Sequence, residues 1–386
     1  MKKTAIIHAN IVLKDHYIPD GILLIEDGII QDFDEMRHLP IPEGYEVLDA
    51  GGNWLGPGFI DIHTHASDVK FFTDDPISCA KHHLKHGTTS VYPALYFSMN
   101  TEQYVKAVNQ MKDAMKQDGG KNIRGVYMEG PYLNPKFGCD KEHCPWKGDV
   151  DKAAYQPVID AAADMALVWA LAPERGGILD FVKDVRKANP DAVFSCAHSE
   201  ASPEQVEALM PYGLRIGTHH TDATGGPQVY PDPEIVCVGV DEAVNMNDDI
   251  WAELICDSRG IHVAPYMLRL VRKIKGENKI ILISDAYAAD GPVPEGYDDP
   301  YDINFDITGE IAGSKLTLDV AMHNMMVHTG ASVVDVFRYA TVNPARATRI
   351  TDRGEIKKGL KADLVICDGD IHVKKVLMAG EVVSEA

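Results

Sequence analysis

The sequence predicts an α/β protein: a (β/α)8 TIM-like barrel with a small β-sandwich domain built from both chain ends. Three observations predict this fold. Both ends hold short apolar runs broken by turn residues, the middle alternates apolar runs with helical patterns, and polar residues follow most of the middle runs. A chain of 386 residues is long enough for a large barrel and a second, smaller unit.

The two ends of the chain have the same β-rich pattern. Near the start, apolar runs occupy 4–7, 11–13, 21–25, 28–30 and 45–48; near the end they occupy 362–366 and then Val373, Val376, Leu377, Val382 and Val383. Turn residues such as Glu26-Asp27-Gly28 separate these runs, which indicates strands joined by tight turns. We therefore assign 1–55 plus 347–386 to one small β domain and 56–346 to the barrel.

The middle of the chain predicts repeated βα units. Eight candidate strands lie at 58–62, 89–93, 124–128, 167–171, 193–197, 214–218, 252–256 and 280–284. Helical patterns lie between them, for example at 101–116, 178–189 and 203–210. A doubly wound open sheet is the alternative, but polar residues at the carboxyl ends of most strands favour the barrel.

Composition narrows the function classes. The chain is 45% hydrophobic and 25% charged, as in a globular protein, and its net charge is −21. That charge argues against a nucleic-acid partner or an anionic membrane surface, although a local pocket can still take a small anionic substrate. The chain has no apolar run of about 18 residues and no secretory-signal pattern, and its seven cysteines are scattered. We expect a cytoplasmic protein with no membrane partner.

Chemistry-bearing side chains follow several predicted strands. His63 and His65 stand two apart at the end of the first strand, so both imidazoles face one way. Other candidates follow later strands: Glu129, His198, His219 and Asp285. In a barrel these strand ends meet at one mouth. Imidazole and carboxylate together suit Zn²⁺, Fe²⁺, Mn²⁺ or Ni²⁺, and a bridging carboxylate allows one or two ions per chain.

Other histidines are expected to be structural. His220 directly follows His219, so only one of the two points inward, and His219 is the candidate ligand. His82, His83 and His86 fall in a helical pattern and are expected on its solvent face.

Longer motifs resemble those of a known family. Residues 57–65 read PGFIDIHTH and residues 128–135 read MEGPYLNP; further matches lie at 171–174, 197–199, 284–286, 312–317, 343–346 and 359–363. These motifs resemble those of the amidohydrolase superfamily and, within it, the N-acetylglucosamine-6-phosphate deacetylases. The match covers nearly the whole chain.

The resemblance implies roles for the candidate residues. Glu129, His198 and His219 would hold one metal ion, and His63 and His65 a second, with Glu129 bridging. Asp285 would be the catalytic acid–base that takes a proton from water and delivers it to the leaving nitrogen. The substrate-binding candidates are His262, Asp222, Ala223 and Ser314. Arg259 is a further candidate, as an anion contact in the segment 256–262, which is longer than the corresponding segment of the family. Zinc is the expected metal, with iron, manganese or nickel as alternatives, and the resemblance implies a homodimer.

The implied reaction is removal of an N-acetyl group from an amino sugar. Two departures from the family pattern bear on the substrate. Asp222 places a negative charge where the family has an amide, and residues 226–250 contain six acidic residues and no Lys or Arg. An unphosphorylated N-acetyl amino sugar, or another amide or C–N bond, therefore stays open as an alternative. A scaffold without catalysis is disfavoured, because every expected ligand is present.

Overall fold

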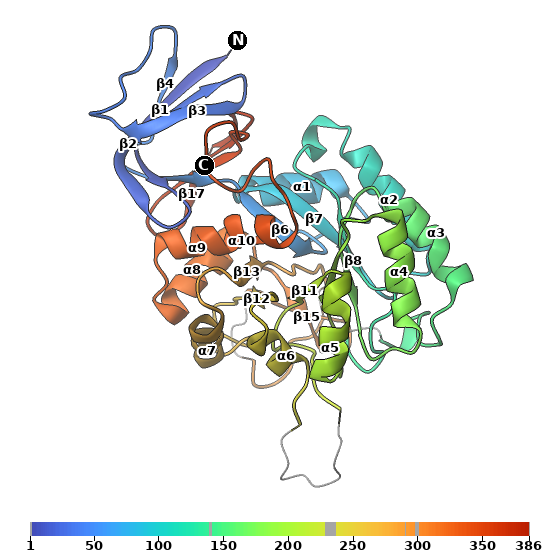
Figure 1. The fold of residues 1–386 in the computed structure, drawn as a ribbon. Coiled ribbons are helices and arrows are strands. Elements are labelled where there is room, and N and C mark those ends of the chain that lie inside the picture. Colours follow the sequence, from blue (N-terminus) through green and yellow to red (C-terminus); the bar gives the residue numbers. More distant parts are fainter. Residues whose placement is uncertain (1, 139–140, 228–236, 290, 298–300, 386) are drawn as a thin grey trace.

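The computed structural model describes residues 2–138, 141–227, 237–289, 291–297 and 301–385. Its central feature is a parallel sheet of eight strands that run side by side in chain order (Figure 1). The strands are β6 (Phe59–Thr64), β7 (Thr88–Leu95), β8 (Val126–Glu129), β9 (Ala166–Leu171), β10 (Val193–Cys196), β11 (Leu214–Gly217), β12 (Trp251–Ile255) and β13 (Ile280–Ile283). Each of the eight predicted strands is present.

The first and last strands of this sheet approach each other and nearly close a barrel. The backbone N–H of Asp285 donates to the carbonyl of His63 at 2.9 Å, and the N–H of His65 donates to the carbonyl of Ala286 at 2.9 Å. The hydroxyl of Ser284 also donates to the buried Asp61 carboxylate at 2.6 Å. These contacts confirm the predicted barrel and exclude a doubly wound open sheet.

Helices cover the outside of the barrel (Figure 1). They are α1 (Pro76–Lys85), α2 (Thr101–Ala114), α3 (Lys152–Ala162), α4 (Ile178–Ala188), α5 (Pro203–Leu209), α6 (Val240–Met246), α7 (Pro265–Lys275), α8 (Leu318–Thr329), α9 (Val333–Ala340) and α10 (Val342–Ala347). Short 3₁₀ turns lie at Asp118–Gly120, Lys141–His143 and Met210–Tyr212. Reciprocal side-chain caps fix several starts: Asn100 with Gln103 begins α2, and Ser202 with Gln205 begins α5. In the described part of the chain, every helix is too short or too polar to cross a bilayer.

The two ends of the chain form one further sheet, as predicted. Its strands are β1 (Lys3–Val12), β2 (Tyr17–Glu26), β3 (Ile29–Glu35), β4 (Glu46–Asp49), β5 (Trp54–Pro57), β16 (Leu364–Cys367), β17 (Val373–Met378) and β18 (Glu381–Glu385). β5 and β16 pair antiparallel, with Leu55 opposite Ile366. Leu55, Leu364, Ile6 and Leu23 share a separate small core. The domain borders at 55/56 and 346/347 stay a prediction.

A short hairpin follows the last barrel strand. It consists of β14 (Ile303–Phe305) and β15 (Ile311–Ser314), and an isolated bridge joins Ser314 to Ala286. The hairpin thereby lies against the segment that carries Asp285.

Gly56 lets the small sheet pack closely on the barrel's helices. It lies in β5, and a Cβ placed on it would come within 2.1 Å of the ring of Phe337 in α9. That ring is almost fully buried and contacts the ring of Phe59 in β6, with 5.6 Å between their centroids. A larger residue at Gly56 therefore collides with a ring that has little room to move.

We expect Gly56→Ala to lower the free energy of unfolding by about 1–3 kcal/mol, the usual cost of overpacking. The midpoint of urea denaturation measures the effect. Gly148→Ala is the control, since nothing lies within 4 Å of its added Cβ. Equal midpoints for the two variants would contradict the proposed contact.

Candidate active site

Six of the predicted side chains meet at the carboxyl ends of the barrel strands. They form two groups, and within each group one ligand atom of every residue lies within 4.8 Å of the others. The first group is His63, His65 and Asp285, and the second is Glu129, His198 and His219. All six are buried.

Glu129 connects the two groups. Its Oε1 is 3.0 Å from Nε2 of His198 and 3.7 Å from Nε2 of His219, and its Oε2 is 3.3 Å from Nε2 of His65. On the other side, Nε2 of His65 lies 3.3 Å from Oδ1 of Asp285. The end of β8 therefore places one carboxylate in reach of both sets of imidazoles.

Three of these residues have a left-handed backbone. The φ angles are 43° at His198, 28° at His219 and 45° at Asp285. Each residue lies within two positions after its strand ends, where the chain turns across the barrel mouth. A positive φ at a residue other than glycine costs free energy and is concentrated at functional sites, so the strain at three strand ends marks this mouth.

The charges of the cluster compensate one another. Burial opposes ionisation of Glu129, yet His198, His219 and His65 hold its pKa well below the usual range. Burial likewise opposes charge on His65, but Asp285 and Glu129 raise its pKa to about 10. For His219, burial lowers the pKa and Glu129 and Asp222 raise it, again to about 10. Positive charge is therefore needed among these carboxylates, from protons or from a cation.

The residues fit a divalent cation. Several buried polar atoms in the cluster have no hydrogen-bond partner: Nε2 and Nδ1 of His63, Oε2 of Glu129 and Nδ1 of His198. Unpartnered buried donors and acceptors are uncommon, and a mixed imidazole and carboxylate set is typical of transition-metal sites. Two groups of three ligands, with Glu129 of the second group also close to His65 of the first, allow one or two ions.

A cavity of about 290 Å³ opens beside this cluster. Three predicted substrate-binding residues line it, namely His262, Asp222 and Ala223. The buried side chain of His262 has its Nδ1 3.3 Å from Oδ2 of Asp257, while its Nε2 has no partner. His262 can therefore make a hydrogen bond to a ligand through Nε2.

Asp257 organises the loop that carries His262. Its carboxylate accepts the backbone N–H groups of Arg259, Ile261 and His262 at 2.9–3.0 Å. Burial opposes its charge, but these groups and the His262 ring lower the pKa of Asp257 to about 2. The segment 257–262 thus forms a turn around a single carboxylate.

Two predicted substrate-binding residues do not line the cavity. Arg259 is exposed in the turn described above, where its backbone, rather than its guanidinium, is held. Ser314 is buried, its N–H donates to the carbonyl of Asp285 at 2.9 Å and its hydroxyl donates to the carbonyl of Ser284. Ser314 therefore holds the backbone of Ser284 and Asp285 rather than a ligand.

The prediction for the helical histidines is wrong for His83. This residue of α1 is fully buried, and its Nε2 lies 2.8 Å from the carbonyl oxygen of Ala66. Burial lowers its pKa to about 4. The backbone just beyond His65 needs a donor there, which a helical pattern alone does not reveal.

Sequence reasoning missed several lining residues, among them Tyr96, Tyr287, Glu310 and Lys136. Tyr96 directly follows β7, and Tyr287 stands two residues after Asp285. Their positions after strand ends are the signal that could have identified them. Lys136 follows the MEGPYLNP segment and forms an ion pair with Glu200.

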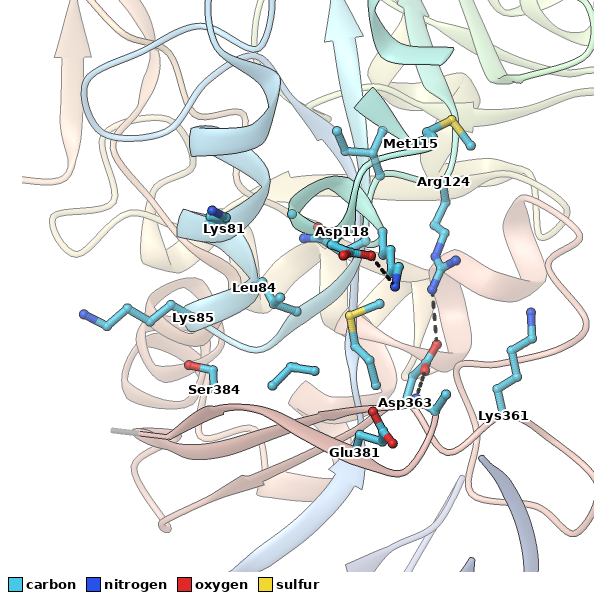
Figure 2. Close-up of a pocket in the computed structure, with 17 residues that line it drawn as sticks. Lys81, Leu84, Lys85, Met115, Asp118, Arg124, Lys361, Asp363, Glu381 and Ser384 are labelled. Carbon is cyan, nitrogen blue, oxygen red and sulfur yellow. Dashed lines mark hydrogen bonds and ion pairs between the residues drawn. The ribbon is translucent and has the colours of Figure 1, made fainter. Parts of the chain in front are cut away.

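A larger cavity, of about 830 Å³, lies toward the opposite end of the barrel strands, beside Arg124 just before β8 (Figure 2). Side chains of α1, of the segment 115–124 and of β17 and β18 surround it. Arg124 is 3.7 Å from Asp363, and Lys121 is 2.7 Å from Asp118. None of the predicted catalytic or metal-binding residues lines this cavity, so chemistry rather than volume identifies the site.

Comparison with known proteins gives the family. The family model described as Amidohydrolase family matches residues 54–383, most of the chain. The chain belongs to the amidohydrolase family.

Two relatives match this chain over more than nine tenths of both lengths. The N-acetylglucosamine-6-phosphate deacetylase of Lysinibacillus sphaericus is 27% identical, over 93% of this chain and 92% of that protein. The N-acetylgalactosamine-6-phosphate deacetylase of Escherichia coli O157:H7 is 26% identical, over 97% of both chains.

Two solved deacetylase structures have a similar fold along the chain. The N-acetylglucosamine-6-phosphate deacetylase of Thermotoga maritima has a TM-score of 0.82 and 25% identity, covering 99% of this chain and 100% of that one. A variant of the Mycobacterium smegmatis enzyme, solved in complex with N-acetyl-D-glucosamine-6-phosphate, has a TM-score of 0.81 and 25% identity, with 100% of both chains covered.

The pair His219 and His220 allows a test of the metal site. His219 faces Glu129, whereas Nε2 of His220 lies 3.1 Å from Oδ1 of Asn245 and Nδ1 lies 3.4 Å from Asp241. We expect His219→Ala to lower the bound divalent metal by one ion per chain and His220→Ala to leave it unchanged. Elemental analysis after dialysis against metal measures this. Equal loss in both variants would contradict the assignment.

Proposed function

We propose that this chain is a metal-dependent hydrolase that removes the acetyl group from an N-acetylated amino sugar, with N-acetylhexosamine 6-phosphates as its substrate class. One observation carries the proposal: four imidazoles and two carboxylates meet beside a cavity that also holds the unpartnered Nε2 of His262. Relatives named as deacetylases of such sugars support the substrate class.

The proposed metal ligands are Glu129, His198 and His219 for one ion and His63 and His65 for a second, with Glu129 shared. A divalent cation bound there supplies water of lowered pKa and polarises a carbonyl oxygen. We further propose zinc as the metal, a homodimer as the assembly and the cytoplasm as the location.

Asp285 is the proposed acid–base. It lines the cavity, and its Oδ1 is 3.6 Å from Nε2 of His63 and 3.3 Å from Nε2 of His65. Burial opposes its charge, but the neighbouring histidines hold its pKa well below the usual range. Asp285 is therefore ionised near neutral pH and can accept a proton from water. Returning that proton to the nitrogen lets the amine leave, because an amide anion is a poor leaving group.

His262 is the proposed substrate contact. Burial opposes charge on His262, but Asp257 raises its pKa. The protonated ring donates Nδ1–H to Asp257 and keeps a proton on Nε2, which can be donated to the acyl oxygen as negative charge develops there. The aromatic rings of Tyr96, Phe137 and Tyr287 line the same cavity and offer apolar surface to a sugar ring.

The charged residues of the cavity bear on whether the sugar is phosphorylated. Lys136 is the one Lys or Arg among the described lining residues, and it forms an ion pair with Glu200. A substrate phosphate would replace Glu200 as the partner of Lys136 and bind it more strongly. Asp222 and Glu310 line the same cavity and favour an uncharged sugar, which keeps the unphosphorylated alternative open.

Acetate release from N-acetylhexosamine 6-phosphates and from the unphosphorylated sugars tests the substrate. We expect the phosphorylated sugars to have the higher kcat/KM, and Lys136→Met to lower kcat/KM for them alone by roughly 10- to 100-fold, the value of a hydrogen bond to a charged group. Lys81→Met, in the larger cavity, is the control. Equal turnover of both sugar classes would favour the unphosphorylated alternative.

Asp285→Asn tests the acid–base role. We expect kcat to fall by roughly 10²- to 10⁴-fold, because proton transfer loses its positioned base. The ion held by Glu129, His198 and His219 should remain, as metal analysis of the variant will show. A variant with the wild-type kcat would exclude Asp285 as the base. Chelation that leaves wild-type turnover intact would exclude the metal.

A further inference from the structure

Glu253 is a buried carboxylate that the proposed chemistry does not use. It lies in the middle of β12, its side chain is 0% exposed, and neither carboxylate oxygen has a hydrogen-bond partner. A buried carboxylate with no hydrogen bond costs several kcal/mol. A functional role for Glu253 would explain why a carboxylate is buried at this position.

The ring of His63 is a polar group close to this carboxylate. Oε2 of Glu253 lies 3.5 Å from Nδ1 of His63, just beyond hydrogen-bond distance, and both side chains are fully buried. On the other side of the ring, Nε2 of His63 is 3.8 Å from Glu129 and 3.6 Å from Asp285. Glu253 and the metal cluster thus lie on opposite edges of one imidazole.

The ring of His63 has little freedom to turn. It stacks on the ring of Tyr127, with 4.3 Å between centroids and 24° between planes. Hydrogen bonds of 2.8 Å to Ser195 and Thr218 hold the Tyr127 hydroxyl. The stacking fixes the plane of His63, but stacking alone does not determine which ring nitrogen carries the proton.

The backbone of Glu253 is also fixed. Its carbonyl accepts the N–H of His220 at 2.7 Å, and Glu253 pairs with Ile281 of β13. The strand that presents this carboxylate to His63 therefore also holds the loop of His219.

We infer that Glu253 is a positioning residue for the second metal site. Its carboxylate faces Nδ1 of His63 at 3.5 Å, so its negative charge favours the tautomer with the proton on Nδ1 and leaves the Nε2 lone pair directed toward Glu129 and Asp285. A carboxylate behind a metal-bound imidazole fixes the tautomer and strengthens the ligand, and its loss typically costs 10- to 100-fold in metal affinity. Glu253 thus favours a two-ion centre in this chain. The inference rests on the metal-ligand roles proposed above.

The test compares Co²⁺ binding by the wild type, Glu253→Leu and Glu253→Gln. Binding is followed by cobalt per chain and by the visible absorption of each bound ion. We expect Glu253→Leu to weaken the second ion by roughly 10- to 100-fold and to leave the first ion in place. Glu253→Gln keeps an acceptor oxygen without the charge, so its affinity should lie between the other two.

The stability of the metal-free proteins separates positioning from a structural role. Metal-free Glu253→Leu should unfold at the same or a higher urea concentration than metal-free wild type, because an unpartnered buried carboxylate is removed. A structural role would instead lower stability and metal binding together. If the leucine variant does not fold, the isosteric glutamine variant makes the same comparison.

Asp363→Asn is the matched control. Asp363 is also a buried carboxylate, but Arg353 and the N–H of Ala379 bind it, and it lines the other cavity. We expect the Asp363→Asn variant to bind cobalt with the same stoichiometry and affinity as the wild type. Two ions bound to Glu253→Leu with wild-type affinity, or equal loss of both ions, would overturn the inference. A wild type that binds no ion would instead overturn the proposed function.

Discussion

The barrel mouth depends on one electrostatic constraint, which is that two buried carboxylates need positive charge close by. Glu129 and Asp285 reach the same imidazoles from strands on different parts of the barrel. Neither carboxylate would stay ionised at such burial without these partners. The imidazoles therefore balance the buried negative charge and also offer ligand atoms. The same side chains that allow two carboxylates to be buried together thus suit the site to a metal ion.

The backbone around this cluster reflects the same constraint. The left-handed turns at His198, His219 and Asp285 bring side chains from separate strands toward one point. Strain of that kind persists only where the surroundings fix it. At Asp285 the hairpin of β14 and β15 provides such support, since the N–H of Ser314 donates to the carbonyl of Asp285.

The sequence was sufficient for the barrel and for the meeting of these imidazoles and carboxylates at its mouth, because both depend on simple periodicities. His63 and His65 face one way since strand side chains alternate, and the ends of parallel strands meet at one edge. Residues whose position depends on packing were harder to find. Glu253 resembles any residue of an apolar strand, and His83 resembles any helical histidine until its buried contact with Ala66 is seen. Ser314 was assigned by motif, and Arg259 as an anion contact in a segment that departs from the family pattern, whereas the orientation of both depends on local turns that the sequence pattern does not encode.

The pairing of β5 with β16 has a consequence for how the chain folds during synthesis. These strands are hydrogen-bonded neighbours, although Leu55 and Ile366 are separated by the entire barrel. The first strands therefore leave the ribosome with one sheet edge open, and that edge stays unpaired until β16 emerges. A nascent chain of this architecture needs protection at its beginning for as long as translation of the rest takes.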